Sequence, residues 1–417
     1  MSNLSLRGQN YARNVYVSPR GPQNLFHPDK NPDGIVTFAD AENFLMQPEL
    51  ISYLNKHARF PSAAASYNQG FTGTLELCNA MANHINTYFA PTLHITAEHL
   101  TWAAGVTALI ELLTLVLCDE EESILIGSTI YGMFNKDVTT RTASKLEYVK
   151  FGSVDQFSPE VVLVYETTLL AAKSAGKKIK ALLICNPHNP LGRAFSRETL
   201  RGLLDLASRY NIHLISDEIY ALSMFPTAGR DAELFTSVLS LETKRPDLVH
   251  VLYGMSKDFA GAGLRLGCLI SRSPDVHAAV RPITRFGAPS EFSMALATQV
   301  LSDASFVKSF FESSSKRLGA AYARTTALLD EAKIPYNRAG NAGFFIWLDL
   351  SRYVAGNGSD EWLAESILSK EFEEAGVDMA AGSAYHAEKA GYFRLIFTAE
   401  DGRVGEGIKR IRNVLGT

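Results

Sequence analysis

Short runs of consecutive apolar residues recur along the middle of the chain and predict buried β-strands. Clear examples are Ser123–Gly127, Ala181–Cys185, Ile212–Ser216 and Val249–Tyr253. Runs of this length, in which polar and apolar residues do not alternate, are typical of strands that are covered on both faces. A helical pattern, Arg197–Tyr210, separates the second run from the third. Strands that alternate with helices predict an α/β fold with a mostly parallel sheet.

The C-terminal part of the chain predicts a smaller group of elements. Leu301–Leu329 has the pattern of a long helix. Glu361–Ala375 has a helical pattern and lies between two apolar segments, Gly343–Leu350 and Tyr392–Phe397, which predict a small sheet.

Residues 1–60 are loop-rich, and we expect them to fold with the C-terminal part of the chain. We therefore predict a small α/β domain formed by residues 1–60 and 305–417, and a large domain formed by residues 61–304. The large domain would hold the alternating strands and helices.

The ends of three predicted strands carry residues that are suited to binding and catalysis. Asn189 follows the strand at 181–185, Asp217 and Tyr220 follow the next strand, and Lys257 follows the strand at 249–253. Because the carboxyl ends of parallel strands share one edge of a sheet, these residues are expected to border one crevice. A desolvated lysine amine forms imines with carbonyl compounds. Taken singly, Lys257 also fits a surface turn, and Asn189 fits a turn before proline.

Five short motifs occur in an order that resembles a known enzyme family. They are Ala41-Glu42-Asn43, Asn-Pro-x-Asn-Pro-Leu-Gly at 186–192, Ser-Asp-Glu-Ile-Tyr at 216–220, Ser256-Lys257-Asp258, and Gly-Tyr-Phe-Arg at 391–394. The chain resembles the pyridoxal-phosphate (PLP) enzymes of class I/II, in particular the 1-aminocyclopropane-1-carboxylate (ACC) synthase-like branch. The resemblance implies the PLP-dependent transferase fold type I, with a seven-stranded, mostly parallel sheet in the large domain. It also implies a homodimer with shared active sites.

The same resemblance assigns roles around the cofactor. Lys257 would hold PLP as an imine and later move the Cα proton of the substrate. Asp217 would pair with the pyridine nitrogen and keep the ring protonated, so that the ring accepts electrons. Asn189 and Tyr220 would hydrogen-bond the phenolic oxygen, and Tyr131 would stack on the ring. Without the resemblance, Asp217 fits a helix cap or turn, and Tyr131 fits an ordinary half-buried tyrosine.

The cofactor phosphate needs donors and positive charge. Gly105, Val106 and Thr107 precede the apolar helical stretch Ala108–Leu117, and a helix N-terminus offers free N–H groups and a favourable dipole to an anion. The resemblance adds Ser256 and Arg265 to this phosphate cup, the arginine as a bidentate contact. The cup is therefore expected to combine backbone donors with one permanent positive charge.

Two residues depart from the family pattern at the phosphate. Gly254 stands where a serine is usual, and Phe71 stands where ACC synthases place a tyrosine that reaches the phosphate in the neighbouring subunit. Both hydroxyl contacts are missing, so either the cup is rebuilt locally or PLP binds less tightly. Restoring serine at Gly254 is expected to give a modest gain in PLP affinity, unless a backbone angle restricted to glycine makes the change harmful.

The substrate is expected to meet three residues. Arg394 lies within an otherwise apolar strand, where an arginine without a partner is costly, and the family's partner for it is the substrate α-carboxylate. Asn189 would border the substrate beside it. Glu42 matches the acidic residue that lies near the sulfonium substrate in ACC synthases; an exposed glutamate is the other interpretation.

Composition is that of an ordinary enzyme. The chain has 417 residues, 46% of them hydrophobic, and a net charge of −4, so nothing favours binding to nucleic acid or to an anionic membrane. No apolar run has the length of a membrane span and the N-terminal residues lack a signal-peptide core, so we expect a soluble, cytoplasmic protein. Four isolated cysteines are expected to be reduced, without metal-ligand spacing: Cys78, Cys118, Cys185 and Cys268.

Three hypotheses for the function follow. The first is a PLP-dependent carbon–sulfur lyase that removes the Cα proton of an amino acid and expels sulfur, from S-adenosylmethionine with ring closure or from a cysteine conjugate. The second is an aminotransferase that uses a 2-oxo acid, with Arg281 or Arg285 as a receiver for a distal carboxylate; each also fits a surface or interface arginine. The third is a non-catalytic PLP-binding regulator, which the retention of Lys257, Asp217 and Arg394 disfavours.

Overall fold

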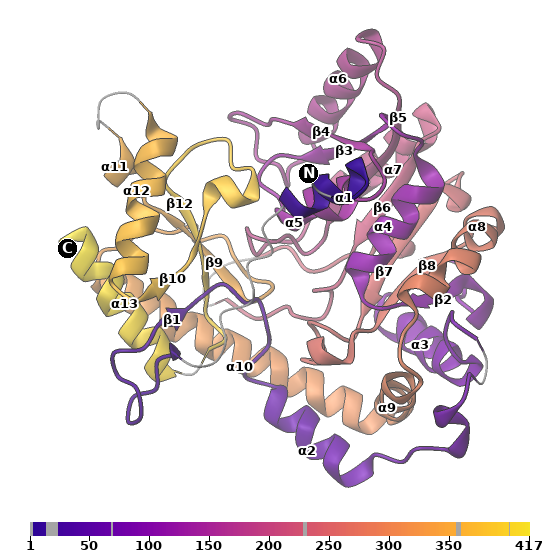
Figure 1. Cartoon of the computed structure of the whole chain (residues 1–417), viewed down its shortest axis with the longest axis horizontal. Helices are drawn as coiled ribbons and strands as arrows, with labels where there is room; N and C mark the ends of the chain where they lie inside the picture. Colours follow the sequence, from indigo (N-terminus) through magenta and orange to yellow (C-terminus); the bar gives the residue numbers. More distant parts are fainter. Residues whose placement is uncertain (1–2, 14–23, 68–69, 228–231, 356–359, 400) are drawn as a thin grey trace.

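The chain forms two connected parts, each built on its own sheet. The computed structural model describes residues 3–13, 24–67, 70–227, 232–355, 360–399 and 401–417. The larger part holds most of the first 300 residues, and the smaller part holds the C-terminal strands and helices (Figure 1). Helix α10 (Ala304–Glu331) runs from one part to the other.

The sheet of the larger part has seven strands in the order β2-β8-β7-β6-β5-β3-β4. Strand β8 is antiparallel to both of its neighbours, whereas the other pairs are parallel. The predicted mostly parallel seven-stranded sheet is confirmed. The strands are β2 (Leu100–Ala103), β3 (Ser123–Gly127), β4 (Lys145–Val149), β5 (Ile179–Cys185), β6 (His213–Asp217), β7 (Val249–Gly254) and β8 (Gly267–Ser271).

Helices cover both faces of this sheet, and alternate strand residues belong to different cores. Leu183 and Cys185 pack in the core that contains residues of α4, α5 and α8, whereas Leu182 and Ile184 pack in the core that contains residues of α3, α6, α7 and α9. Successive side chains of a strand point to opposite faces, so continuous apolar runs follow from coverage of both faces. These helices are α3 (Leu75–Tyr88), α4 (Val106–Leu117), α5 (Met133–Thr139), α6 (Val161–Ser174), α7 (Arg197–Tyr210), α8 (Pro274–Thr284) and α9 (Glu291–Ser302).

The smaller part contains a three-stranded antiparallel sheet in the order β11-β12-β9. Strand β1 near the N-terminus pairs in parallel with β10, so an early segment of the chain joins the C-terminal part. The boundaries proposed for the two domains stay a prediction. The elements are β1 (Val36–Thr37), β9 (Phe345–Asp349), β10 (Val377–Asp378), β11 (Ala380–Ala381), β12 (Tyr392–Ile396), α11 (Ser351–Val354), α12 (Glu361–Glu374) and α13 (Asp401–Leu415).

The long helix begins later than its sequence pattern predicted. Helix α9 ends at Ser302, and α10 starts after Asp303, whose carboxylate accepts a hydrogen bond of 2.9 Å from the backbone N–H of Phe306. The expected helix at 301–329 is therefore wrong at its start, because an aspartate N-cap separates two helices there.

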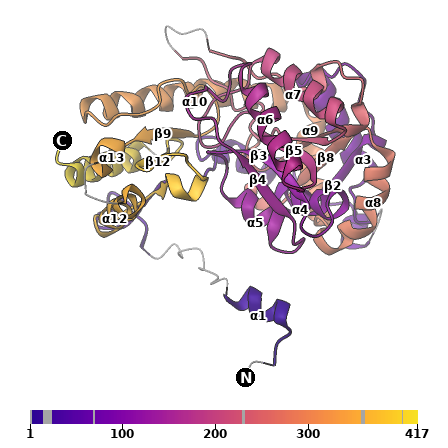
Figure 2. The same ribbon diagram turned by 90° about the horizontal axis from the view of Figure 1, so that it is seen from above.

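The N-terminal region is less loop-rich than expected. It contains α2 (Gln47–His57), which packs against α9, and the ring of Tyr53 stacks on Phe306 with 3.9 Å between ring centroids. It also contains α1 (Leu6–Arg13), which has no buried side chain and stands apart from the body of the molecule (Figure 2). Short 3₁₀ helices occur at Ser62–Ala65, Ala97–His99, Val238–Ser240, Pro246–Leu248, Ala262–Leu264, Arg285–Gly287 and Gly382–Tyr385.

All four cysteines are buried, as expected of core residues, and none is paired with another. In the described ranges, no helix combines the length and the apolar character that crossing a membrane requires.

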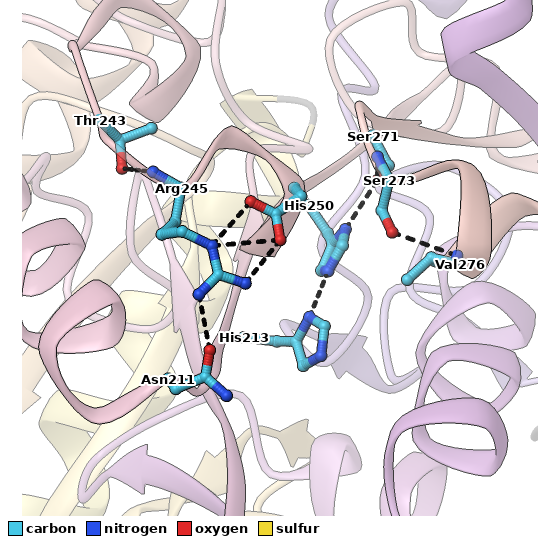
Figure 3. A network of polar contacts seen from close by, with 9 residues as sticks. Asn211, His213, Thr243, Arg245, His250, Ser271, Ser273 and Val276 are labelled. Carbon is cyan, nitrogen blue, oxygen red and sulfur yellow. Dashed lines mark hydrogen bonds and ion pairs between the residues drawn. The ribbon is translucent and has the colours of Figure 1, made fainter.

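A buried chain of polar contacts lies near the start of β6 and β7 (Figure 3). His213 Nδ1 lies 2.8 Å from His250 Nε2, and His250 Nδ1 lies 2.9 Å from Ser271 Oγ. His250 is fully buried, and burial lowers its pKa to about 3. This histidine therefore stays neutral in the folded protein at pH values where an exposed histidine is charged.

We expect His250 to make the folded protein less stable in acid. In the unfolded chain the imidazole takes up a proton near pH 6.5, so its contribution to stability is present above that pH and is lost as the pH falls. Between pH 7 and pH 5, the free energy of unfolding of the wild type should fall by about 2 kcal/mol relative to His250→Gln. Urea unfolding at each pH measures the difference, and parallel pH profiles of the two proteins would contradict a neutral buried His250.

Candidate active site

A cavity of about 320 Å³ opens where β5, β6 and β7 end. This is the edge of the sheet at which the sequence predicted a crevice. Eleven of the predicted site residues line the cavity. They come from the N-terminal segment, the start of α4, the ends of strands of the large sheet and the segments that follow them, and the small sheet. They are Glu42, Val106, Thr107, Tyr131, Asn189, Asp217, Tyr220, Ser256, Lys257, Arg265 and Arg394.

Lys257 enters the cavity shortly after β7 ends. Its Nζ donates a hydrogen bond of 2.7 Å to the backbone oxygen of Ala41 and lies 6.0 Å from the ring centroid of Tyr220. Burial and then the charge of Arg394 lower the pKa of Lys257 to about 8, although the charges of Glu42, Asp217 and Asp40 raise it. A larger fraction of this amine is therefore uncharged and nucleophilic near neutral pH than is usual for lysine.

The acidic neighbours of Lys257 should tune its pKa in a predictable order. Glu42→Gln removes a charge that raises the pKa, so the pKa of Lys257 should fall below about 8, and Asp40→Asn should lower it less. Arg394→Leu should raise it. The pH dependence of acylation of the peptide that contains Lys257, followed by mass spectrometry, measures these shifts. An unchanged pKa in Glu42→Gln would show that Glu42 does not act on this amine.

Asp217 is the last residue of β6 and is 5% exposed. Burial raises the pKa of this carboxyl to about 7, while the backbone N–H of Ile219, which donates to Oδ1 at 3.2 Å, and the charge of Lys257 lower it. A buried carboxylate of this kind is stabilised by a cation placed against it. Its position fits the predicted partner of a protonated pyridine nitrogen.

Two tyrosines border the cavity as neutral phenols. Burial raises the pKa of Tyr131 to about 12, and burial raises the pKa of Tyr220 well above its ordinary value. Tyr131 precedes α5, and Tyr220 follows β6. Both therefore keep their hydroxyl protons at neutral pH, which fits roles in stacking and in hydrogen-bond donation.

Arg394 lies in the middle of β12 and is 4% exposed. Its Nη1 donates to Asn189 Oδ1 at 3.2 Å, and its Nη2 donates to the backbone oxygen of Ala39. The rings of Tyr385 and Phe345 lie 5.0 and 5.8 Å from its Cζ. Within the described part of the chain, its buried Nε has no hydrogen-bond acceptor. An unpaired buried N–H on a cation is costly, so the arrangement fits a carboxylate ligand.

Three glycines shape the end of the cavity that was expected to hold a phosphate. A Cβ on Gly105 would lie 2.7 Å from Arg265 Nη2, one on Gly267 would lie 2.5 Å from the carbonyl carbon of Gly105, and one on Gly254 would lie 2.3 Å from the backbone oxygen of Leu266. The strands β7 and β8 and the start of α4 therefore approach closely. Gly105 is the N-cap of α4, so free N–H groups and the Arg265 guanidinium meet at one place, which fits an anion.

The expected gain in PLP affinity from Gly254→Ser is wrong, because it assumed an unfilled gap beside Gly254. The backbone of Gly254 does not have the positive φ that would reserve the site for glycine. The obstacle is space, because Gly254 pairs with Gly267 and leaves no room for a side chain. The position therefore has a structural need for glycine, and the missing hydroxyl is not a gap that serine would fill.

Gly254→Ser should consequently weaken the protein. Overpacking of a close contact costs about 1–3 kcal/mol, so the cofactor-free variant should melt at a lower temperature than the wild type and bind PLP less tightly. Differential scanning fluorimetry and equilibrium dialysis measure the two effects. A Gly254→Ser variant that melts at the wild-type temperature and binds PLP more tightly would contradict this steric explanation.

Three side chains named from the sequence lie outside the cavity wall, those of Phe71, Arg281 and Arg285. The ring of Phe71 is 37% exposed and lies 5.7 Å from the guanidinium carbon of Arg285. Arg281 is engaged elsewhere, because its Nη2 donates to the backbone oxygen of Glu98 at 2.7 Å. Neither arginine lines the cavity. That Phe71 serves the site of a neighbouring subunit stays a prediction.

The cavity also contains residues that the sequence did not single out. Asp137 lines it from α5, burial raises its pKa to about 7, and its Oδ2 is buried without a partner among the described groups. Asp40 lines it beside Glu42. The spacing of Phe134 and Asp137 places both residues on one face of α5, because residues three apart share a helix face. The helix is too short for this pattern to be recognised in the sequence.

Fold and site together define a class of protein, and comparison with known proteins agrees. The family model of aminotransferase class I and II matches residues 47–411, and the chain belongs to this family, whose members depend on PLP. Solved structures with the same fold include the aspartate aminotransferase from Thermus thermophilus with maleate (TM-score 0.75, 18% identity, 99% of this chain and 100% of that chain). Another is the aromatic aminotransferase from Pyrococcus horikoshii OT3 (TM-score 0.73, 21% identity, 92% and 96%). The predicted fold is confirmed.

Within the family, the chain is ACC synthase-like, as its motifs predicted. It is 31% identical over 405 residues to 1-aminocyclopropane-1-carboxylate synthase 2 of Cucurbita pepo, which covers 94% of this chain and 80% of the relative. It is 32% identical over 397 residues to 1-aminocyclopropane-1-carboxylate synthase 4 of Oryza sativa subsp. japonica (88% and 79%). It is also 29% identical over 390 residues to the "Probable aminotransferase tcpI" of Claviceps purpurea (strain 20.1) (91% and 89%).

Proposed function

We propose that this protein is a PLP-dependent carbon–sulfur lyase, which removes the Cα proton of an amino acid and expels a sulfur leaving group. The observation that carries the proposal is the presence of Lys257, Arg394 and Glu42 in one cavity, with the charge of Glu42 acting on the Lys257 amine. The similarity to ACC synthases supports it. The substrate is either S-adenosylmethionine, with ring closure, or a cysteine-derived thioether.

The residues of this chain divide the work. Arg394 and Asn189 hold the substrate carboxylate, which places the Cα–H bond near Lys257. The uncharged Lys257 amine takes up that proton. Bound PLP would supply the electron sink for the pair of electrons left at Cα. Asp217 keeps the pyridine nitrogen protonated.

Further residues hold the cofactor in place. The start of α4, from Gly105 to Thr107, holds the phosphate together with Ser256 and Arg265. Tyr131 covers the ring. Tyr220 donates a hydrogen bond to the phenolic oxygen. By holding the cofactor at its phosphate and at its ring, these residues would fix the orientation in which the substrate meets Lys257, and that orientation would decide which bond is cleaved.

Charge in the cavity favours the lyase over a transaminase of dicarboxylates. The described cations that line the cavity are Lys257, Arg265 and Arg394, and each has a proposed partner. Among the described residues that line the cavity, no further cation is left for a side-chain carboxylate, whereas Asp40 and Glu42 are placed to attract a cationic side chain. Transamination with a 2-oxo acid remains the second candidate, and the fungal relative named as a probable aminotransferase favours it.

Product identification tests the proposal. The purified protein is incubated with S-adenosylmethionine, with cysteine conjugates, and with amino acids plus 2-oxoglutarate, and products are identified by mass. Methylthioadenosine or a released thiol supports the lyase, and a new amino acid formed from the 2-oxo acid supports the aminotransferase. S-adenosylhomocysteine, which lacks the sulfonium charge, is the matched control. Absence of every product from PLP-loaded protein would favour the non-catalytic regulator and overturn the proposal.

Substitutions of Asp217 and Arg394 should cause different kinetic defects. Asp217→Asn keeps the shape of the side chain but not the charge, so it should bind PLP and lower kcat by about 10²-fold or more. Arg394→Leu removes the carboxylate partner, so it should mainly raise KM, by about tenfold or more. Steady-state kinetics and cofactor content separate the two. The same kinetic defect in both variants, at equal PLP content, would contradict this division.

We further infer a homodimer with its sites near the interface. Phe71, Phe286 and Tyr67 form an exposed aromatic patch and are 37%, 77% and 85% exposed. The guanidinium of Arg285 lies over the rings of Phe71 and Phe286, and the ring of Tyr67 contacts that of Phe71. The patch adjoins the phosphate end of the cavity, because Ala104 N–H donates to the backbone oxygen of Gly287 at 2.7 Å. Large exposed apolar patches mark interfaces, and a second copy would place its Phe71 near this end.

Phe286→Asp should weaken the dimer and lower PLP affinity at the same time. Leu163 is a matched control, because it is an apolar residue with 68% exposure on α6, at a distance in sequence from the patch. Light scattering after size-exclusion chromatography should show a dimer for the wild type and for Leu163→Asp. An active wild-type monomer at assay concentration would contradict the shared site.

A further inference from the structure

Asp258, the residue after Lys257, is a buried acid, and both of its carboxylate oxygens accept hydrogen bonds. Asp258 is 1% exposed. Its Oδ2 accepts hydrogen bonds from the backbone N–H of Leu222 at 2.8 Å and from the hydroxyl of Tyr253 at 3.0 Å, and its Oδ1 accepts one from Ser223 Oγ at 2.5 Å. Lys257 lines the cavity, whereas Asp258 is turned into the interior. The two adjacent side chains therefore point to different places, that of Lys257 into the cavity and that of Asp258 into the protein interior.

The donors to Asp258 belong to the segment that carries the other site residues. Leu222 and Ser223 lie in the turn after β6, and this turn is closed by the hydrogen bond of 3.0 Å from Ser223 N–H to the backbone oxygen of Tyr220. Tyr253 lies in β7, the strand that leads to Lys257. One carboxylate thus ties the end of β7 to the turn that follows Asp217 and Tyr220.

The same turn also contacts the smaller part of the molecule. The backbone oxygen of Ser223 accepts a hydrogen bond of 2.9 Å from Gly343 N–H, and Phe225 N–H donates to the backbone oxygen of Asn341 at 3.0 Å. This stretch leads directly into β9, where the ring of Phe345 faces the Arg394 guanidinium. The turn held by Asp258 is therefore hydrogen-bonded both to the residue after Lys257 and to the stretch that leads into β9.

The largest charge effects on the pKa of Lys257 come from residues that line the cavity with it, namely Arg394, Glu42, Asp217 and Asp40. Asp258 is connected to the cavity by its hydrogen bonds to the turn after β6 and to β7. Burial raises the pKa of this carboxyl to about 7, although these hydrogen bonds lower it. The contribution of Asp258 is consequently one of geometry.

We infer that Asp258 is a positioning residue, whose carboxylate holds Lys257 in register with Tyr220 and Asp217 for covalent capture of the cofactor. This inference rests on the proposed function, because it assumes that Lys257 bonds to PLP. It predicts that loss of the carboxylate changes the reactivity of Lys257 more than it changes the stability of the protein.

Asp258→Asn is the direct test, because the amide keeps the shape but turns one acceptor into a donor that faces other donors. Cofactor-free protein is mixed with PLP, and covalent capture is followed by visible absorbance and by mass after borohydride reduction. Misplacement of a reacting group by about 1 Å costs up to about 10²-fold, so capture should slow by roughly tenfold to 10²-fold. The pH at which the visible band titrates should shift as well, which a purely stabilising residue would not cause.

Glu122→Gln provides a matched carboxylate-to-amide control. Glu122 is 7% exposed, accepts a hydrogen bond of 2.9 Å from Asp119 N–H and forms an ion pair with Lys178 at 3.3 Å. It directly precedes β3 and so lies at the opposite edge of the sheet from the cavity. This variant should lower the melting temperature of the cofactor-free protein while the rate of PLP capture and the titration of the visible band stay unchanged.

Two variants that each remove one hydrogen bond test the inference if Asp258→Asn does not fold. Tyr253→Phe and Ser223→Ala each remove one donor to Asp258 and should each slow capture by a smaller factor. In the double variant Asp258→Asn with Ser223→Ala, the second change should add little, because both changes break the same contact.

The outcomes separate this inference from the proposed function. Wild-type protein that fails to capture PLP, or Lys257→Ala that gives the same visible band, would overturn the proposed function. Normal wild-type capture with Asp258→Asn, Tyr253→Phe and Ser223→Ala all within twofold of it would overturn only the positioning role. Slower capture in these variants but not in Glu122→Gln would support it.

Discussion

The burial of opposite charges at one edge of the large sheet is the constraint on which the rest of the structure depends. Asp217 and Arg394 are buried there and Lys257 is partly buried beside them. A buried charge is tolerated only when other groups compensate for it. The compensating groups come from distant segments: the backbone oxygen of Ala41 accepts from Lys257, and Asn189 accepts from Arg394. The cavity therefore exists only when the N-terminal segment, the large sheet and the small sheet have come together.

Close packing of backbone sets the other end of the cavity. At Gly105, Gly254 and Gly267 the absence of side chains lets two strands and a helix start approach one another. Side chains at these positions would push the helix N-terminus away from Arg265, and an anion would then lose either the free N–H groups or the charge. A missing hydroxyl at Gly254 is thus part of how the site is built, and not a defect in it.

At two strand ends, a residue that lines the cavity is followed directly by a buried acid. Asp217 is followed by Glu218, and Lys257 is followed by Asp258; each second acid is buried and accepts several hydrogen bonds from nearby turns. In each pair the first residue lines the cavity and the second is buried, so one short motif both supplies the cavity and anchors the backbone behind it. This double use explains why the motifs are compact enough to be seen in the sequence.

The sequence by itself determined the alternating strands and helices, the helix Arg197–Tyr210 and the order of residues at the strand ends, because burial on both faces of a sheet leaves a local apolar pattern. It did not determine the break at Asp303, the contribution of Asp137 to the cavity, the lack of space at Gly254 or the engagement of Arg281 with backbone oxygens. Most of these features depend on distances between residues that are far apart in the chain. Only the packed tertiary structure decides such distances, since local periodicity records which face of an element is buried but not what it is buried against.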